Sequence, residues 1–406
     1  MTAGTAARGG LRRDIAAISI GHGLFALGQW VIGAALAKLA GVEAMAAFGL
    51  ALAVSNPIYF LANMALRTAL ARDAAGEFAL ADYVRARIAS TAAAFVAMAA
   101  AALTVGLERG ADGAAALLLF ACVKSADAGF DLIYGQRQRD GEAAKVTVSL
   151  AFRSTLGPAA VVAGLLLTDG ALWAGLAAWA AAATLLFLAL EAPGLVRRVR
   201  GTGGAGAMAV VARAWPLGVG AALASLETAI PRYAIEWLMP PEALGYFTAV
   251  FMFFAAAQIV ASAFGSAATP HLGRAHAAGD RRRFRRMVVL LCLFGAGLGA
   301  VGVAVAWALG GWALGVIYTP AYSAYADVLT LTMVGAGLRF VASFLQFALV
   351  AAGRFKTHMA IHAGLAAMAA GAAPPLAAAY GLAGAALALI IVGIAQVVVL
   401  AGLLAR

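Results

Sequence analysis

Residues 382–404 read LAGAALALIIVGIAQVVVLAGLL and carry no charged side chain. A helix of this length crosses the hydrocarbon core of a bilayer, which is roughly 30 Å thick. Eleven further apolar stretches of comparable length lie at residues 15–38, 45–66, 88–107, 114–135, 146–168, 170–190, 214–238, 243–268, 287–309, 328–350 and 357–378. The sequence therefore predicts an all-α polytopic membrane protein with about 12 transmembrane helices.

Overall composition agrees with this class of protein. The chain is 64% hydrophobic and 12% charged, a balance that soluble domains do not have. Cys122 and Cys292 both lie within predicted spans, so no disulfide framework is indicated. The short loops hold no soluble domain and no hydrolytic or redox constellation. We therefore expect a protein that is not an enzyme and that needs no cofactor or metal.

Basic residues are distributed unevenly along the chain. Of the 29 Lys and Arg residues, 23 lie at the termini or in even-numbered loops, and only Lys38 and Arg109 flank odd-numbered loops. By the positive-inside rule, both termini and all even loops face the cytoplasm. The net charge of +11 is then explained by topology and by anionic membrane lipids, so we expect no nucleic-acid partner.

The two halves of the chain resemble each other. Glu43 and Phe48 at the start of the second span match Glu242 and Phe247 at the start of the eighth, an offset near 200 residues. This order of landmarks predicts two pseudo-symmetric six-helix bundles, at 1–192 and 214–406, joined by a cytoplasmic linker at 193–213. A parallel repeat places the substrate path between the halves at mid-membrane. Shared Ala/Gly-rich composition is the alternative explanation.

Four basic residues inside spans are not explained by topology. They are Lys124, Arg153, Arg232 and Arg339. A charge in the hydrocarbon region faces a cavity or a partner, so these residues are our candidates for substrate binding. Lys124 shares a helical face with Asp127 and Asp131, so pairing within that helix is an alternative. For Arg153, the alternative is that its side chain reaches the inner headgroups.

The seventh span reads LETAIPRYAIE at residues 226–236. Pro231 has no N–H, so the carbonyl of Glu227 loses its helical partner, and we predict a helix break there. Pro57 frees the carbonyl of Ala53 in the same way. Glu227 is a candidate site for a coupling H⁺ or Na⁺, and Asp131 is a second. A local pair between Arg232 and Glu236 is an alternative role for Arg232.

Arg339 lies near the middle of the tenth span, with no carboxylate within four residues on its own helix. Its partner must come from another helix or from substrate. Arg339 is therefore our first candidate for a cationic cavity and Arg232 the second, while an interhelical pair with Glu227 is the alternative for Arg339. The glycines at 295, 297 and 299 follow no strand, so they predict close helix packing instead of a nucleotide loop.

Several segments resemble the polysaccharide-transporter branch of the MOP superfamily. They are IPRYAIE at 230–236, LGYF at 244–247, ATPHL at 268–272, GQRQRDGE at 135–142 and YTPAY at 318–322. The resemblance implies a MATE-like fold of two six-helix bundles around a central cavity, in the bacterial cytoplasmic (inner) membrane. It also implies export of a lipid-linked oligosaccharide, whose pyrophosphate would cross beside cationic residues such as Arg153, Arg232 and Arg339.

A second function stays open at this point, a cation-coupled exporter of small drugs or metabolites. The first span offers His22 and Gln29 but no carboxylate at its centre, unlike many cation-coupled drug exporters of the superfamily. Twelve spans also differ from the fourteen of the peptidoglycan-precursor flippases. We therefore favour flipping of a polyprenyl-pyrophosphate-linked oligosaccharide for surface polysaccharide synthesis.

Overall fold

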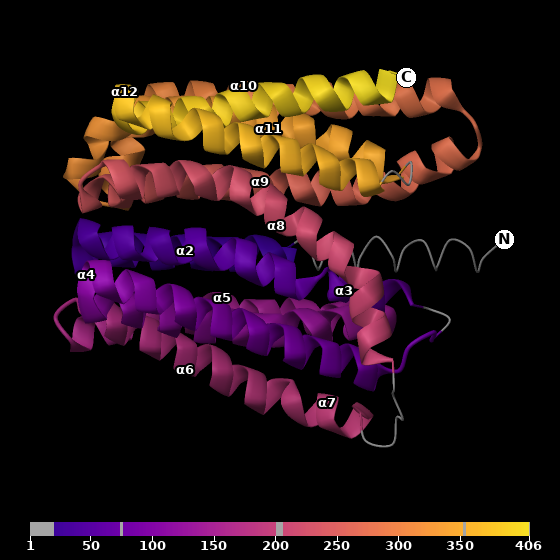
Figure 1. Cartoon of the computed structure of the whole chain (residues 1–406), viewed down its shortest axis with the longest axis horizontal. Coiled ribbons are helices and arrows are strands. Elements are labelled where there is room, and N and C mark those ends of the chain that lie inside the picture. The colour runs from indigo at the N-terminus through magenta and orange to yellow at the C-terminus, as the bar shows by residue number, and fades with distance from the viewer. Residues whose placement is uncertain (1–19, 74–75, 200–205, 352–354, 406) are drawn as a thin grey trace. The chain divides into compact units, whose positions relative to one another are not determined.

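The computed structural model describes residues 20–73, 76–199, 206–351 and 355–405, and these contain helices and no strand (Figure 1). The chain divides into two compact units. Unit 1 consists of Met1–Ala40 and Val54–Ala222, and unit 2 consists of Gly41–Ala53 and Leu223–Arg406. The predicted bundle boundaries at 192 and 214 stay a prediction.

Three glycines divide long helices into pairs of membrane spans. The helical stretches Ile20–Ala71 and Met359–Leu404 contain 52 and 46 residues. At 1.5 Å per residue each is about 70 Å or longer, roughly twice the hydrocarbon core. The first changes direction at Gly41 (φ +89°) and the second at Gly381 (φ +61°), while the 60-residue helix α4 (Leu80–Arg139) does so at Gly110 (φ +75°). Glycine adopts these positive φ values without a Cβ clash.

Within the described residues these breaks give twelve helical segments long enough to span a membrane, which confirms the predicted fold class. Unit 1 contains the helical residues 20–35, the π turn η1 (Leu36–Ala40), the second part of α2 (Gly41–Asn63), α3 (Leu66–Arg72), α4, α5 (Ala143–Leu167), α6 (Leu172–Leu190), α7 (Ala192–Val199) and the first part of α8 (Ala207–Leu238). Unit 2 contains the rest of α2 and α8, with α9 (Pro241–Ala277), α10 (Arg281–Ile317), the 3₁₀ turn η2 (Pro320–Tyr325), α11 (Ala326–Ala351) and α12 (Phe355–Ala405).

The core of unit 1 forms around α4, which packs against α3, α5 and α6. Leu66 and Leu70 of α3 contact Tyr83 and Leu132 of α4 in one buried cluster. A second cluster joins Phe130 and Tyr134 of α4 to Val146 and Leu150 of α5. This packing fixes the second span of α4 against α5, and both helices carry candidate site residues.

The core of unit 2 forms around α11, which packs against α9, α10 and α12. A Cβ atom added to Gly299 of α10 would lie 2.6 Å from the Cα of Gly337 in α11, and one added to Gly295 would meet the Phe344 ring. The two helices therefore approach closely at small residues, as expected for helices in lipid. This agrees with the predicted packing role for Gly295 and Gly299, whereas a Cβ atom at Gly297 would meet nothing within 4 Å.

Large apolar side chains remain on the outer surface of both units. On α10 they include Leu290, Leu293, Val301 and Trp307, the last of which is 79% exposed. Such a surface is unfavourable in water and favourable against acyl chains. Together with the spans it identifies a multi-pass membrane protein.

The kink or break predicted at Pro57 and Pro231 does not interrupt either helix. α2 is helical from Gly41 to Asn63 and α8 from Ala207 to Leu238, through both prolines. The fixed φ of proline suits a helix, and a freed carbonyl can find another donor. At Pro57 that donor is the hydroxyl of Tyr233, which lies 2.6 Å from the Ala53 carbonyl oxygen.

Candidate functional site

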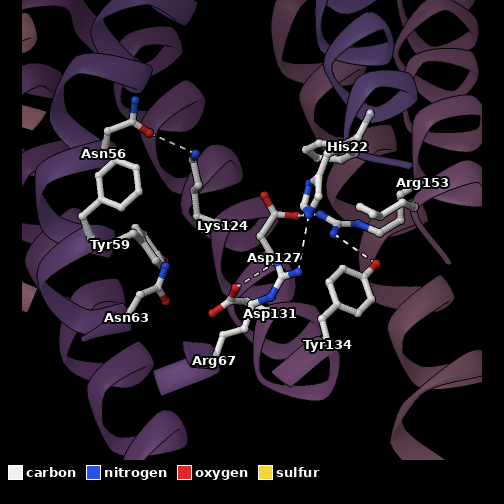
Figure 2. A pocket seen from close by; sticks show the side chains of 13 residues that line it. His22, Asn56, Tyr59, Asn63, Arg67, Lys124, Asp127, Asp131, Tyr134 and Arg153 are labelled. Atoms are coloured by element: carbon white, nitrogen blue, oxygen red, sulfur yellow. Dashed lines mark hydrogen bonds and ion pairs between the residues drawn. The ribbon is translucent and has the colours of Figure 1, made fainter. Parts of the chain in front are cut away.

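A polar pocket of about 290 Å³ lies within unit 1 (Figure 2). We call it the membrane pocket. Its lining comes from the first helix, α2, α3, α4 and α5, and consists of His22, Phe25, Asn56, Tyr59, Phe60, Asn63, Arg67, Lys124, Asp127, Asp131, Tyr134, Leu150 and Arg153. The structure thus brings together four residues that the sequence singled out, Lys124, Asp127, Asp131 and Arg153.

Lys124 lies deep in the membrane-spanning part of α4. It is about 21 Å along the helix from Gly110 and about 23 Å from Arg139 at 1.5 Å per residue. Its ammonium group donates to the Asn56 side-chain oxygen at 3.0 Å and lies 5.3 Å from the centre of the Phe120 ring. Both contacts are with neutral groups, so neither cancels the charge of Lys124.

Arg153 is held by one carboxylate and two aromatic rings. Its guanidinium forms an ion pair with Asp127 and lies 4.3 Å from the centre of the Phe130 ring and 4.6 Å from that of Phe25. Cation–π contacts of this kind stabilise a desolvated guanidinium. The side chain therefore stays within the membrane pocket, and the alternative of a reach to the headgroups does not apply in this structure.

Asp131 pairs with one arginine from the first span of its own helix α4 and with one from α3. Its carboxylate lies 3.0 Å from Arg87 of the first span of α4 and 3.9 Å from Arg67 of α3. Arg87 is 3% exposed and also contacts the Asn63 side chain. Asp127 and Asp131 thus form ion pairs with different arginines. The alternative that they pair with Lys124 on the same helix does not describe this structure.

The charge of the membrane pocket is positive in sum. Three cations, Arg67, Lys124 and Arg153, line it together with two carboxylates, Asp127 and Asp131. Both carboxylates are engaged by arginines. In the described part of the chain, Lys124 is the one pocket cation with no carboxylate within 4.0 Å. Lys124 is therefore the pocket residue that would attract an entering anion most strongly, because its charge is the least neutralised.

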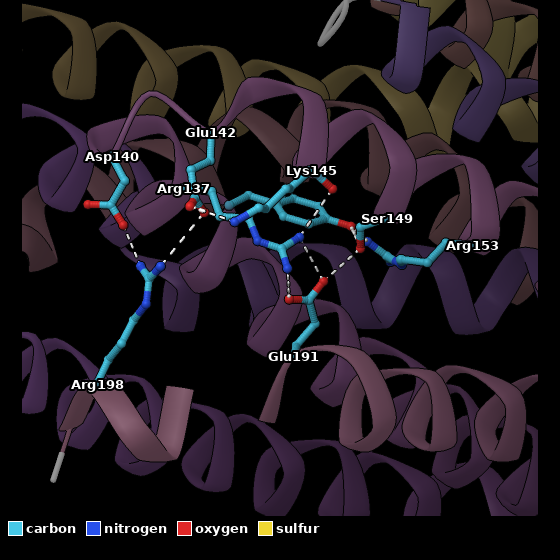
Figure 3. Close-up of polar contacts among 9 residues, drawn as sticks. Arg137, Asp140, Glu142, Lys145, Ser149, Arg153, Glu191 and Arg198 are labelled. Carbon is cyan, nitrogen blue, oxygen red and sulfur yellow. Dashed lines mark hydrogen bonds and ion pairs between the residues drawn. The ribbon is translucent and has the colours of Figure 1, made fainter. Parts of the chain in front are cut away.

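A chain of hydrogen bonds leads from this pocket to the end of α6 (Figure 3). Arg153 donates to the Tyr134 hydroxyl at 3.5 Å, and Tyr134 lies 2.8 Å from the Ser149 hydroxyl. Ser149 then donates to Glu191 at 2.9 Å, and Glu191 pairs with Arg137 at 2.6 Å. The chain links the mid-membrane charges to the surface that the charge pattern predicts to be cytoplasmic.

The remaining sequence candidates lie in unit 2. Arg339 of α11 forms an ion pair with Glu227 of α8, the interhelical alternative that the sequence left open. The same carboxylate contacts His362 of α12, and both of these side chains are almost fully buried. Arg339 also donates to the side-chain oxygen of Gln396 at 3.3 Å. Glu227 thus joins two basic groups from two other helices.

Arg232 is buried against an aromatic ring in unit 2. Its guanidinium carbon lies 4.5 Å from the centre of the Phe251 ring, and its Nε donates to the Thr228 carbonyl at 3.3 Å. Only 2% of the residue is exposed. Arg232 and Arg339 therefore have partners inside unit 2, and the described pockets do not include them.

Sequence reasoning missed several residues of these sites. The sequence places Arg67 and Arg87 among the basic residues of the even-numbered loops, and Asn56 lies beside Pro57 without a predicted role. His22 and His362 were not proposed to have roles, although His362 sits beside Glu227. The usable signal was the pair of carboxylates within one predicted span, Asp127 and Asp131, because a carboxylate at membrane depth requires a cation as partner.

No family model and no curated protein matches this chain. Its structure is similar to that of a multidrug resistance MATE family transporter of the MOP superfamily in an inward-facing conformation, with a TM-score of 0.78 and 13% identity over 94% of each chain. It is also similar to the lipid II flippase MurJ, with a TM-score of 0.72 and 13% identity over 96% of this chain and 87% of that one. A MOP superfamily transporter from Pyrococcus furiosus, described as having a binding pocket of reverse polarity, gives a TM-score of 0.67 and 14% identity over 98% and 95%. The chain therefore has the fold of the MOP superfamily transporters.

Proposed function

We propose that this protein is a membrane transporter that flips a polyprenyl-pyrophosphate-linked oligosaccharide from the cytoplasmic to the outer leaflet by alternating access. The observation that carries the proposal is the positive sum of charge in the membrane pocket, with Lys124 facing neutral groups. A pocket of about 290 Å³ suits the phosphate groups of such a lipid better than its whole glycan. The polyprenyl chain would stay in the bilayer.

The direction of transport agrees with the membrane potential. Moving one negative charge out of an inside-negative cell gains about 2.3 kcal/mol per 100 mV. A pyrophosphate headgroup is therefore driven outward even without a coupling ion. In this proposal Lys124 binds the phosphate. Arg153 and Arg67 add to the positive potential around it, because their ion pairs neutralise only part of their charge.

The experiment compares Lys124→Gln with the wild type in proteoliposomes that contain a short-chain polyprenyl-pyrophosphate glycan. A charge-assisted hydrogen bond contributes about 1.5–3 kcal/mol, so the flipping rate should fall by about tenfold or more. Lys124→Arg should recover part of the rate. Lys38→Gln is the matched control, because Lys38 is exposed and does not line the membrane pocket. A Lys124→Gln protein that is folded and flips the lipid at the wild-type rate would refute the proposal.

The second candidate is a cation-coupled exporter of small drugs. The observation in its favour is that Arg339 and Arg232 are engaged inside unit 2, so they do not add positive charge to a pocket. The same variant separates the two functions. Loss of the Lys124 charge weakens binding of a phosphate-containing substrate but strengthens binding of a cationic drug, because the pocket then holds equal numbers of cations and carboxylates. Tighter drug binding with unchanged lipid flipping would favour the exporter.

A further inference from the structure

A second polar pocket of about 290 Å³ lies at the end of unit 1 where α4, α6 and α7 meet the start of α5. We call it the interfacial pocket. Four basic side chains, Arg137, Lys145, Arg197 and Arg198, line it with two acidic ones, Glu142 and Glu191. Asp140 contacts Arg198 from beside the lining, and the sum of charge is positive even when Asp140 is included. Figure 3 shows how part of this group converges from separate segments: Arg137, Asp140, Glu142, Lys145, Glu191 and Arg198.

The base of the interfacial pocket is built from buried groups. Arg137 pairs with Glu191 at 2.6 Å, and their side chains are 16% and 1% exposed. Arg137 also donates to the Lys145 carbonyl at 3.1 Å, which ties the end of α4 to the start of α5. A largely buried and doubly anchored guanidinium is held in a fixed position, so the pocket does not need to reorganise to receive an anion.

The rim of the pocket carries cations that are only partly neutralised. Lys145 lies 2.6 Å from Glu142, and Arg198 shares the same carboxylate at 3.7 Å. The guanidinium of Arg197 donates to the Pro193 carbonyl at 3.2 Å, and within the described residues no carboxylate lies within ion-pair distance of it. Arg197 and Arg198 both line the pocket, so they can present two planar donor groups to one phosphate.

An apolar surface leads directly to this rim. Leu185, Leu188 and Leu190 near the end of α6 are 65%, 53% and 45% exposed. α7 then combines apolar Leu195 and Val196 with Arg197 and Arg198, as a helix lying at the membrane surface does. An acyl chain lying along α6 would place its headgroup at the interfacial pocket. A freely diffusing phosphate ion would gain nothing from the apolar surface, so this surface favours a phosphate that is attached to an acyl chain.

We propose that the interfacial pocket binds the phosphate of an anionic phospholipid in the leaflet predicted to be cytoplasmic. Basic pockets between transmembrane helices on that side are suited to such headgroups. The site does not depend on which molecule the protein transports. It belongs to the membrane around the protein and is separate from the lining of the membrane pocket.

The test measures lipid bound to the full-length protein in detergent by native mass spectrometry, with phosphatidylglycerol as the probe. Wild-type protein should retain one phosphatidylglycerol under conditions that remove phosphatidylcholine. Arg197→Gln/Arg198→Gln should bind it about 25-fold more weakly, since each basic residue near an anionic surface contributes about fivefold. Arg197→Lys/Arg198→Lys should restore part of the affinity.

Arg281→Gln/Arg282→Gln is the matched control, because it removes the same charge from exposed positions of α10. This control should retain the lipid. Equal loss in the control and the test variant would show general surface attraction and would overturn the proposal. Retention by Arg197→Gln/Arg198→Gln at the wild-type affinity would also overturn it, as would displacement of the lipid by an equal concentration of inorganic phosphate.

Discussion

The contacts of Glu227 make a sharp prediction about the stability of unit 2. Its carboxylate is fully buried and joins Arg339 of α11 to His362 of α12. Glu227→Gln keeps the shape of the side chain but removes the charge that neutralises Arg339. The Arg339 side chain is only 17% exposed, so it would remain a largely buried cation without an ion-pair partner.

Breaking a buried ion pair from one side typically destabilises a protein by about 3–5 kcal/mol. Two acceptors of Arg339 would survive, the Gln396 side-chain oxygen at 3.3 Å and the Ala224 carbonyl at 3.4 Å. Both distances are long for such bonds, so they offset little of the lost charge, and we expect a loss of about 3 kcal/mol. Arg339→Gln should cost a similar amount. Glu227→Gln/Arg339→Gln leaves no unpaired charge between these two positions and should cost less than the sum of the single variants by about 2 kcal/mol or more.

The assay is reversible unfolding of the purified protein in detergent, measured for the wild type, both single variants and the double variant. A surface pair supplies the control cycle. Glu77 and Arg213 form an ion pair whose side chains are 56% and 65% exposed, so Glu77→Gln/Arg213→Gln should show a coupling of about 1 kcal/mol or less. Additive losses for Glu227 and Arg339 would refute the reasoning.

Two further predictions concern the backbone. A Cβ atom at Gly384 would lie 1.8 Å from the Leu376 carbonyl oxygen, so Gly384→Ala should lower the unfolding temperature in detergent. Gly402→Ala is the control and should not lower it, because a Cβ atom there meets nothing within 4 Å. Equal unfolding temperatures for the two variants would contradict this prediction. Burial raises the pKa of Asp73, but N–H groups donating from residues 77 and 78, together with the charge of Arg139 and the Tyr83 hydroxyl, outweigh it and lower the pKa overall. Its stabilising contribution is therefore present above the unfolded pKa of about 3.9 and is lost as the pH falls through the lower folded value. Asp73→Asn should speed hydrogen exchange of those two amides at pH 7 and have little effect in strong acid, and unchanged exchange at pH 7 would count against the assignment.

The membrane spans could be predicted because the relevant property is local. Length and hydropathy of a segment decide whether it crosses a bilayer, and all twelve predicted stretches correspond to helical segments. The prolines misled the prediction, because a helix tolerates a missing hydrogen bond when another group serves the carbonyl, as Tyr233 does for Ala53. The actual breaks occur at glycines with positive φ, such as Gly110 and Gly381, and both lie in the short gaps between predicted spans, at 108–113 and 379–381.

The candidate site could be predicted only in part. Lys124 and Arg153 stood out because charges are rare in spans, and both line the membrane pocket. Their partners depend on which helices are neighbours, and the sequence carries no direct record of that. Arg67 appeared to be a topological positive charge, yet it contacts an aspartate 64 positions further along the chain, Asp131. For Arg339 the absence of a nearby carboxylate correctly indicated a partner from another helix or from substrate, and the structure supplies Glu227.

The hydrogen-bond chain from Arg153 to Glu191 has a fixed proton order. Glu191 pairs with Arg137 as a carboxylate, so it can only accept, and the single proton of Ser149 must point towards it. Ser149 can then only accept from Tyr134, whose oxygen in turn accepts from Arg153. Every donor therefore points the same way, and the aligned dipoles strengthen one another. Arg153 can only donate and the Glu191 carboxylate can only accept, so the two ends of the chain fix the direction of every hydrogen bond between them.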